Sequence, residues 1–161
     1  MTFVYVLVSG KNDLYYEQAL MSTYSLRNLM PDANIALLVD NKTEDSINSD
    51  SLKRAEIKKY VSKIISVQFD EKVSNAERSR LIKTSIPEYI DDDFLYIDCD
   101  TIIADDLSEI EKTPYKTAGI LDGHVMLDSE RRMQHKGKHS RKRKNVRNNE
   151  NNRRKSRKYF L

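Results

Sequence analysis

Cysteine is almost absent from this chain of 161 residues, which contains only Cys99. A single cysteine excludes an internal disulfide, so we expect the protein to occupy a reducing compartment. Long apolar runs are absent as well. The only apolar run near the N-terminus, Phe3 to Val8, is too short for the core of a signal peptide and follows no basic residue. No segment approaches the length of a membrane span, and we therefore expect a cytoplasmic protein.

The net charge of the chain is +3, but the charges are distributed unevenly along it. Residues 1–130 contain 14 Lys and Arg but 24 Asp and Glu, so this part carries a charge of −10. Residues 131–161 contain 14 Lys and Arg and one acid, Glu150, which gives +13. We therefore divide the chain into a globular domain of ordinary size at 1–128 and a basic low-complexity tail at 129–161.

Strand-like and helix-like patterns alternate along residues 1–122. Short β-branched and aromatic runs predict buried strands, whereas apolar residues three or four apart predict helices. The predicted strands are 3–8, 34–40, 63–69, 94–98 and 117–121. The predicted helices are 16–30 and 74–90, the second with Ser74 as its N-cap, and residues 43–60 indicate a polar loop and a surface helix. Such alternation predicts an α/β fold, a mostly parallel sheet with helices on both faces.

Polar side chains follow the predicted strands at the points where these strands end. In parallel sheets, ligands bind outside the carboxyl ends of the strands. We therefore expect one crevice at this edge of the sheet. The side chains expected around it are Ser9, Asp13, Tyr15, Asp40, Asp98 and Asp100.

Asp98 and Asp100 follow directly on the apolar run 94–97. Two like charges so close repel each other, which indicates that a positive partner lies between them. Carboxylates at i and i+2 of an extended segment point to the same side, and two oxygen ligands on one side suit Mg²⁺ or Mn²⁺. Cys99 would then point the opposite way, into the core. The alternative interpretation is an acidic turn, continued by the acids at 91–93 and 105–106.

Two basic residues, Arg80 and Lys83, lie three apart in the helix that precedes the acid pair, so they share one helix face. Cations on that face could meet a diphosphate or the acid pair. The alternative is an ordinary solvated basic face.

Residues 79–110, SRLIKTSIPEYIDDDFLYIDCDTIIADDLSEI, resemble the core of the family 8 glycosyltransferases and their bacterial relatives. In that family an Arg-bearing helix precedes a hydrophobic strand that ends in Asp-x-Asp, and residues 101–107 resemble the pattern that follows it. The likeness extends over about residues 3–127. It implies a GT-A fold, a Rossmann-like sheet that binds a nucleotide sugar.

The resemblance also implies a role for individual residues. Asp98 and Asp100 would hold a Mn²⁺ or Mg²⁺ ion that bridges the diphosphate of a UDP-sugar donor. Arg80 and Lys83 would face this acid pair and the phosphates. The full set of residues implied in donor binding is Val8, Ser9, Tyr15, Arg80, Lys83, Asp98, Cys99 and Asp100.

At the base end of the donor, the resemblance places Val8 and Ser9 near the base and Tyr15 stacked on it. The implied reaction transfers a hexosyl group from the UDP-sugar to a hydroxyl of a saccharide, lipid-linked or protein acceptor, with retention at the anomeric carbon. The metal and the cations would stabilise the departing diphosphate.

The family pattern also includes a second half, which supplies a catalytic acidic motif and a His as the third metal ligand. No such half is recognisable in this sequence. His124 lies too early for that ligand, and His135 and His139 lie in the basic tail without an acidic partner. The resemblance is therefore to the N-terminal portion of the family, it leaves the catalytic residues unassigned, and it leaves open whether this truncated chain is active.

The tail, 129–161, contains almost no apolar residues before its last three, so we expect it to be disordered. A basic tail is typical of arms that bind nucleic acid or anionic membranes. No aromatic residue that could stack on bases precedes Tyr159, and the charge of −10 on the body argues against a nucleic-acid partner. A peripheral membrane contact stays open. We favour a frameshift in an AT-rich gene, because composition changes abruptly near Glu130.

Two rival functions compete with the transferase. YIDCDTI, residues 96–102, is similar to the nucleophile strand of haloacid-dehalogenase-type phosphohydrolases. That motif has Thr or Val where this chain has Ile102, and it usually lies on the first strand, whereas three predicted strands come before it here. The other rival is a non-enzymatic nucleic-acid binder that acts through the basic tail.

Overall fold

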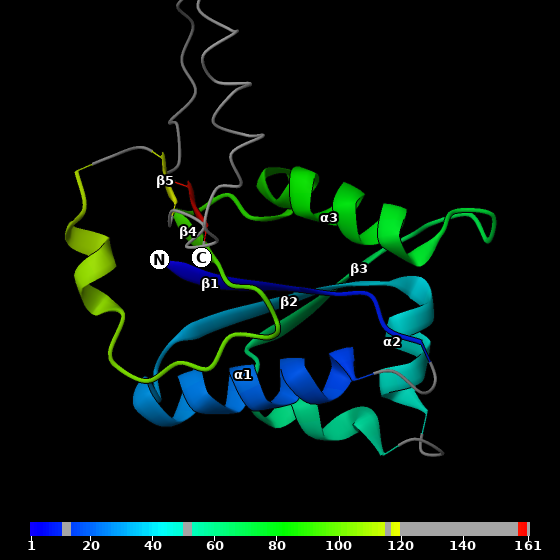
Figure 1. Ribbon diagram of the computed structural model, residues 1–161, viewed down its shortest axis with the longest axis horizontal. Helices are drawn as coiled ribbons and strands as arrows, with labels where there is room; N and C mark the ends of the chain where they lie inside the picture. Colours follow the sequence, from blue (N-terminus) through cyan, green and yellow to red (C-terminus); the bar gives the residue numbers. More distant parts are fainter. Residues whose placement is uncertain (11–13, 50–52, 115–116, 120–157, 161) are drawn as a thin grey trace, which may run out of the picture. The chain divides into compact units, whose positions relative to one another are not determined.

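The computed structural model describes residues 1–10, 14–49, 53–114, 117–119 and 158–160. Strands and helices alternate along these residues (Figure 1). The strands are β1 (Thr2–Leu7), β2 (Asn34–Asp40), β3 (Lys63–Val67), β4 (Phe94–Tyr96), β5 (Thr117–Gly119) and β6 (Lys158–Phe160). The helices are α1 (Tyr15–Leu29), α2 (Asn41–Asn48) and α3 (Asn75–Tyr89), with two 3-10 helices, η2 (Arg54–Lys59) and η3 (Ser108–Lys112).

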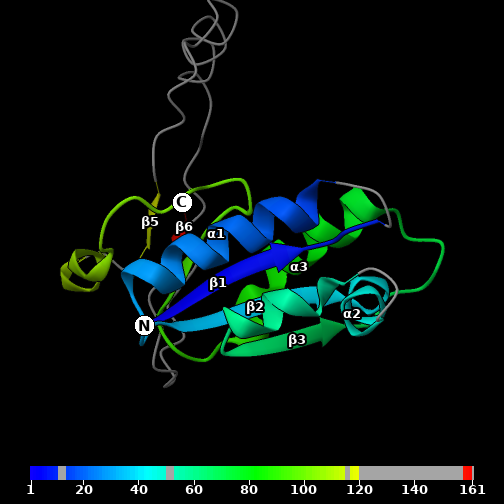
Figure 2. The ribbon, with the colours of Figure 1, turned by 90° about the horizontal axis from the view of Figure 1, so that it is seen from below.

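The strands β3, β2, β1 and β4 lie side by side in this order and are all parallel. Figure 2 shows the first three of them running together. In the central strand β1, Val4 pairs with Ala36 of β2 on one side and with Tyr96 of β4 on the other. The predicted α/β fold with a parallel sheet is therefore confirmed. The short strands β6 and β5 continue the sheet beyond β4, again in parallel.

The order of strands in the sheet changes direction between β1 and β4. After β1 it adds β2 and β3 on one side, and then it crosses over to add β4 on the other side. At such a switch point the loops after neighbouring strands lead to opposite faces, and a crevice opens outside the carboxyl ends of the two strands. The fold therefore places the crevice between the ends of β1 and β4.

Helices cover both faces of the sheet, as predicted, and the side chains of β1 show why. Successive side chains of a strand point to opposite faces. Phe3, Tyr5 and Leu7 are buried in a core that includes residues of α1, whereas Val4 and Val6 are buried in a second core that includes residues of α3. Figure 1 shows these two helices on opposite sides of the sheet. A strand buried on both faces is apolar at every position, which is the pattern of the run 3–8.

The first turn of α3 has the predicted cap. The Oγ atom of Ser74 accepts a hydrogen bond from the backbone N–H of Glu77 at 3.3 Å. This bond satisfies one of the N–H groups that a helix leaves without a partner at its start. The cap fixes the point at which α3 begins, directly outside the carboxyl edge of the sheet.

The prediction of a polar loop and then a surface helix over residues 43–60 was wrong in its first part. Helix α2 begins directly after β2 and is capped by Asp40, whose Oδ1 atom accepts from the N–H of Thr43 at 3.1 Å. Only Thr43 and Ile47 of α2 are buried, so its apolar periodicity is too weak to indicate a helix. The second part is a 3-10 helix, η2, whose Ile57 is fully buried rather than at the surface.

The end of the chain is described only at Lys158–Phe160, which form β6 within the range predicted as the tail. The rest of the tail lies outside the described residues, as do Asp13, the three histidines and the proposed change of frame near Glu130. In the part of the chain that the structure describes, no helix combines the length and the apolar character needed to cross a membrane.

Candidate functional site

A cavity of about 570 Å³ lies where β1 and β4 end, at the switch point of the sheet. Its walls come from the end of β1, the first turn of α1, the N-terminal half of α3 and the turn after β4. A volume of this size lies within the range of pockets that bind small molecules. Six of the eight residues predicted to bind a donor line it, namely Val8, Tyr15, Lys83, Asp98, Cys99 and Asp100.

The acid pair does not lie on an extended segment, so that premise of the prediction was wrong. Strand β4 ends at Tyr96, two residues earlier than predicted, and the carbonyl of Asp98 accepts a hydrogen bond from the N–H of Thr101 at 3.1 Å. Residues 98–101 therefore form a turn. Both carboxylate residues still line the same cavity, because the turn bends around its rim.

Lys83 brings a positive charge to the acid pair. Its Nζ atom lies 2.8 Å from Oδ1 of Asp98, and the hydroxyl of Tyr96 donates to the same oxygen. The Lys83 ammonium also lies over the Tyr96 ring, 5.2 Å from its centroid. Burial and the hydrogen bond to Asp98 raise the pKa of Tyr96, so its hydroxyl remains a proton donor to Asp98. Asp98 is thus held from two sides at one of its two carboxylate oxygens.

The ion pair of Lys83 and Asp98 is partly exposed to solvent. The side chains retain 39% and 47% of their exposure, respectively. Ion pairs with this access to water contribute only about 0–1 kcal/mol to stability. The pair can therefore open without loss of the fold when another charged group enters the cavity.

Cys99 packs on the core as predicted, but it is only partly buried and lines the same cavity as the two carboxylates, so it does not point fully away from them. It packs against the core that includes α1, and its Sγ atom lies 3.3 Å from the carbonyl oxygen of Val6, to which the thiol donates. Burial raises the pKa of the Cys99 thiol to about 12, and the nearby charge of Asp98 adds to this effect. The thiol is therefore protonated at neutral pH although it lies in the cavity wall.

Alkylation of Cys99 tests this environment, because it is the only cysteine of the chain. The thiolate is the reactive form, so we expect iodoacetamide at pH 8 to label the folded protein at least about tenfold more slowly than the urea-unfolded protein. In the unfolded chain the rate should level off above the ordinary thiol pKa of about 8.5, whereas in the folded protein it should still rise at pH 10. Mass spectrometry measures both rates, and equal rates would contradict the burial.

Tyr15 and Val8 lie at the end of the cavity formed by α1 and β1. Tyr15 is the first residue of α1 and is 61% exposed, whereas Val8 is buried in the core that includes α3. An exposed aromatic side chain beside a cavity offers a face on which a planar group can stack. Stacking on a base stays a prediction.

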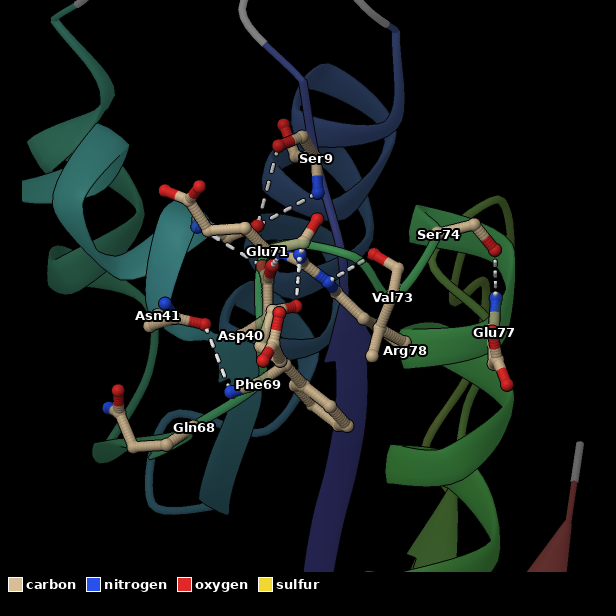
Figure 3. A network of polar contacts seen from close by, with 12 residues as sticks. Ser9, Asp40, Asn41, Gln68, Phe69, Glu71, Val73, Ser74, Glu77 and Arg78 are labelled. Atoms are coloured by element: carbon tan, nitrogen blue, oxygen red, sulfur yellow. Dashed lines mark hydrogen bonds and ion pairs between the residues drawn. The ribbon is translucent and has the colours of Figure 1, made fainter.

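Three residues expected at the site lie elsewhere. Asp40 and Ser9 are buried in polar networks at the ends of β2 and β1, and Asp40 forms an ion pair with Arg78 (Figure 3). The backbone N–H of Ser9 donates to Oγ1 of Thr43 at 2.8 Å, and these contacts hold the start of the loop after β1. Arg80 is exposed. Within the described residues, the cavity wall includes neither Ser9, Asp40 nor Arg80.

Arg78 is a structural residue of the site that the sequence reasoning missed. Its side chain is 1% exposed. It donates to Oδ2 of Asp40 at 2.8 Å, to the carbonyl of Val73 at 2.9 Å and to the carbonyl of Asp70 at 3.0 Å (Figure 3). These bonds tie the start of α3 and the loop before it to the end of β2. The signal in the sequence is the spacing of four from Arg78 to Ile82, which puts Arg78 on the buried face of α3.

The start of α3 was not among the predicted site residues, yet Asn75, Ala76 and Ser79 line the cavity. A helix N-terminus carries a partial positive charge and free N–H groups, and both favour phosphate. Gln18 of α1 also lines the cavity. The sequence did predict the Ser74 cap, but a cap locates the start of a helix along the chain and not its place beside a cavity.

The cavity offers carboxylate ligands that fit a divalent cation, provided that a substrate supplies the remaining ligands. Among the residues that the structure describes, no three His, Cys, Asp or Glu side chains are grouped so that they could hold a metal ion. Two carboxylates, Asp98 and Asp100, do face one cavity, and the ammonium of Lys83 already stands in for a cation at the first of them. Mg²⁺ is commonly held by one or two carboxylates together with substrate phosphates and water.

No protein-family model and no curated protein sequence matches this chain.

Proposed function

We propose that the protein binds a UDP-sugar in this cavity together with Mn²⁺ or Mg²⁺, as the donor of a retaining hexosyltransferase reaction with a GT-A fold. The observation that supports this proposal most is the shared cavity of Asp98, Asp100 and Lys83 with the first turn of α3, at the switch point of a parallel sheet. Two carboxylates, the ammonium of Lys83 and a helix N-terminus in one cavity fit a metal and a diphosphate, whose charges neutralise each other.

The diphosphate belongs between the turn 98–101 and α3. On the α3 side, the helix start and Lys83 provide positive charge. On the turn side, Asp98 and Asp100 would hold the cation. The bound cation would supply charge stabilisation to the departing diphosphate. Donor binding is thus the step that the described residues support most directly.

The proposed reaction transfers a hexosyl group from the UDP-sugar to a hydroxyl of the acceptor. The bond between the anomeric carbon and the β-phosphate oxygen breaks, and UDP leaves with the bonding electron pair. A glycosidic bond forms between that carbon and the acceptor oxygen, whose proton is released. Retention at the anomeric carbon is part of the proposal through the resemblance to the family alone.

Tyr15 has the base-stacking role in this proposal. Stacking on an aromatic side chain contributes about 1–3 kcal/mol per base, so Tyr15→Ala should weaken UDP binding by about tenfold. Tyr15→Phe keeps the ring and should bind UDP nearly as well as the original protein. Calorimetric titration with UDP in the presence of Mn²⁺ measures both variants, and equal losses in the two would assign the effect to the hydroxyl instead of the stack.

The proposal is tested by titrating the protein with UDP by calorimetry, with Mn²⁺ and with a chelator. We expect binding with Mn²⁺ and little binding without it. UMP should bind more weakly than UDP, because it lacks the second phosphate that shares the cation. Metal-independent binding, or no binding of either nucleotide, would refute the proposal.

The phosphohydrolase alternative makes a different prediction for Asp98. It requires covalent transfer of phosphate to Asp98 and release of phosphate from a simple phosphomonoester. Mass spectrometry after incubation with p-nitrophenyl phosphate and Mg²⁺ would detect a phosphorylated aspartate. We expect none.

A further inference from the structure

Asp98 already has a cationic partner from its own chain, although it is one of the two residues proposed to hold a metal. Lys83 Nζ lies 2.8 Å from its Oδ1, and both side chains line the cavity. The hydroxyl of Tyr96 donates to the same oxygen. A cation placed on Asp98 and Asp100 would therefore lie within a few ångströms of the Lys83 ammonium.

Two positive charges at that separation repel each other. At 4 Å between unit charges, the repulsion in a partly solvated site weakens binding by a factor of about ten or more. A divalent cation that binds Asp98 alone, without a diphosphate, would thus be repelled by the positive charge of Lys83. A diphosphate that arrives with the cation changes this balance, because its negative charge offers the ammonium a second partner.

Lys83 has the chemistry and the freedom to change partners. Its side chain is 39% exposed, and a lysine ammonium has three donors on a flexible stem. The start of α3, which is the other phosphate-facing wall of the cavity, belongs to the same helix as Lys83. Tyr96, in contrast, is buried and stays bound to Asp98, so the carboxylate keeps its orientation while the lysine leaves.

We propose that Lys83 is an exchangeable counter-ion of Asp98, which moves from the carboxylate to the diphosphate when the cation binds. Free metal is therefore bound weakly, and metal and nucleoside diphosphate bind cooperatively. This inference rests on the proposed function, because it assumes that the cavity takes a metal and a diphosphate. It adds that the site discriminates against metal alone and against nucleotides too short to reach Lys83.

The test uses the full chain and three variants, Lys83→Met, Lys83→Arg and Lys63→Met. Lys63 is exposed at the first residue of β3, the end of the strand away from the cavity edge, so its variant controls for the lost charge. The first readout is Mn²⁺ binding without nucleotide, measured by the electron paramagnetic resonance of free Mn²⁺. The second is UDP binding at fixed Mn²⁺, measured by calorimetry. Lys83→Gln repeats both measurements if Lys83→Met does not fold.

We expect Lys83→Met to bind Mn²⁺ alone about tenfold more tightly than the original protein and to bind UDP with Mn²⁺ about tenfold more weakly. Lys83→Arg should change neither affinity by more than about threefold, since it keeps the charge. Lys63→Met should leave both unchanged. Opposite changes in the two affinities distinguish exchange from a merely structural role, which would lower both.

Two results would overturn the inference. They differ in whether the proposed function still stands. If Lys83→Met binds Mn²⁺ no more tightly than the original protein, while that protein binds UDP in a metal-dependent way, the counter-ion exchange is refuted and the proposed function stands. If the original protein shows no metal-dependent binding of UDP, the proposed function is refuted and the exchange with it.

Discussion

Replacing Arg78 by methionine is expected to lower the free energy of unfolding by about 3–5 kcal/mol, because it leaves the buried carboxylate of Asp40 without its partner. Both side chains of this pair are 1% exposed. The guanidinium also donates to three backbone carbonyls of residues 70–73, which would lose these bonds. Stabilities of 5–15 kcal/mol are usual for a domain, so the loss would be a large part of the total.

Arg80→Met is the matched control for this measurement, since Arg80 lies two residues further along α3 and is exposed. It removes the same charge and should change the free energy of unfolding by no more than about 0.5 kcal/mol. Urea denaturation followed by circular dichroism compares the two variants. Equal, small effects would mean that the buried pair does not hold α3 against the end of β2.

The second large effect is expected at the acid pair. Replacing Asp98 and Asp100 together by asparagine should weaken metal-dependent UDP binding by about a hundredfold or more, because neutral amides are poor ligands for Mn²⁺ and Mg²⁺. Stability should change little, since Asp98 is 47% exposed and Asp100 lies at the surface. Calorimetry at fixed Mn²⁺ gives the affinity, and a melting curve confirms that the double variant folds.

The matched control for the double variant is Asp91→Asn with Asp92→Asn. These two acids are exposed before β4 and do not line the cavity. Their variant changes the net charge by the same amount and should bind UDP normally. If both double variants lost binding equally, the effect would be one of overall charge, and the assignment of ligands to the turn 98–101 would be lost.

The sequence predicted the parts of the fold that depend on local pattern. Runs of apolar residues such as 34–40 gave strands buried on both faces, and their alternation with helices gave a parallel sheet. From the predicted sheet, polar residues were expected around a crevice at its carboxyl edge, and three of them, Tyr15, Asp98 and Asp100, line one cavity there. These successes share one cause, since a period of two or of 3.6 is visible in a single chain.

The errors concern side chains whose position depends on partners far away in the chain. Asp40 was expected at the crevice, but its ion pair with Arg78, 38 residues later, turns it inward. Arg80 was singled out because it shares a helix face with Lys83 and resembles the arginine of a family pattern, whereas the arginine that forms the buried ion pair is Arg78. Helix α2 was missed because only Thr43 and Ile47 of it are buried, which leaves too weak an apolar periodicity to indicate a helix.

Arg78 connects the fold with the proposed chemistry. Arg78 fixes the start of α3 against β2, and that helix start is the wall that faces the diphosphate in the proposal. The anchored start of the helix thus lies in the same cavity wall as Lys83, whose ion pair with Asp98 is partly exposed. A rigid frame with one exchangeable ion pair is what cooperative binding of a metal and a diphosphate requires.

The central claim is that a cation and a nucleoside diphosphate share this cavity, and paramagnetic broadening of backbone amide resonances tests it most directly. Substoichiometric Mn²⁺ would be added to ¹⁵N-labelled protein saturated with UDP. The account predicts that broadening is strongest at residues 98–101 and extends to 75–79 of α3. Broadening centred on the other acidic stretches, 91–93 or 105–106, would contradict it.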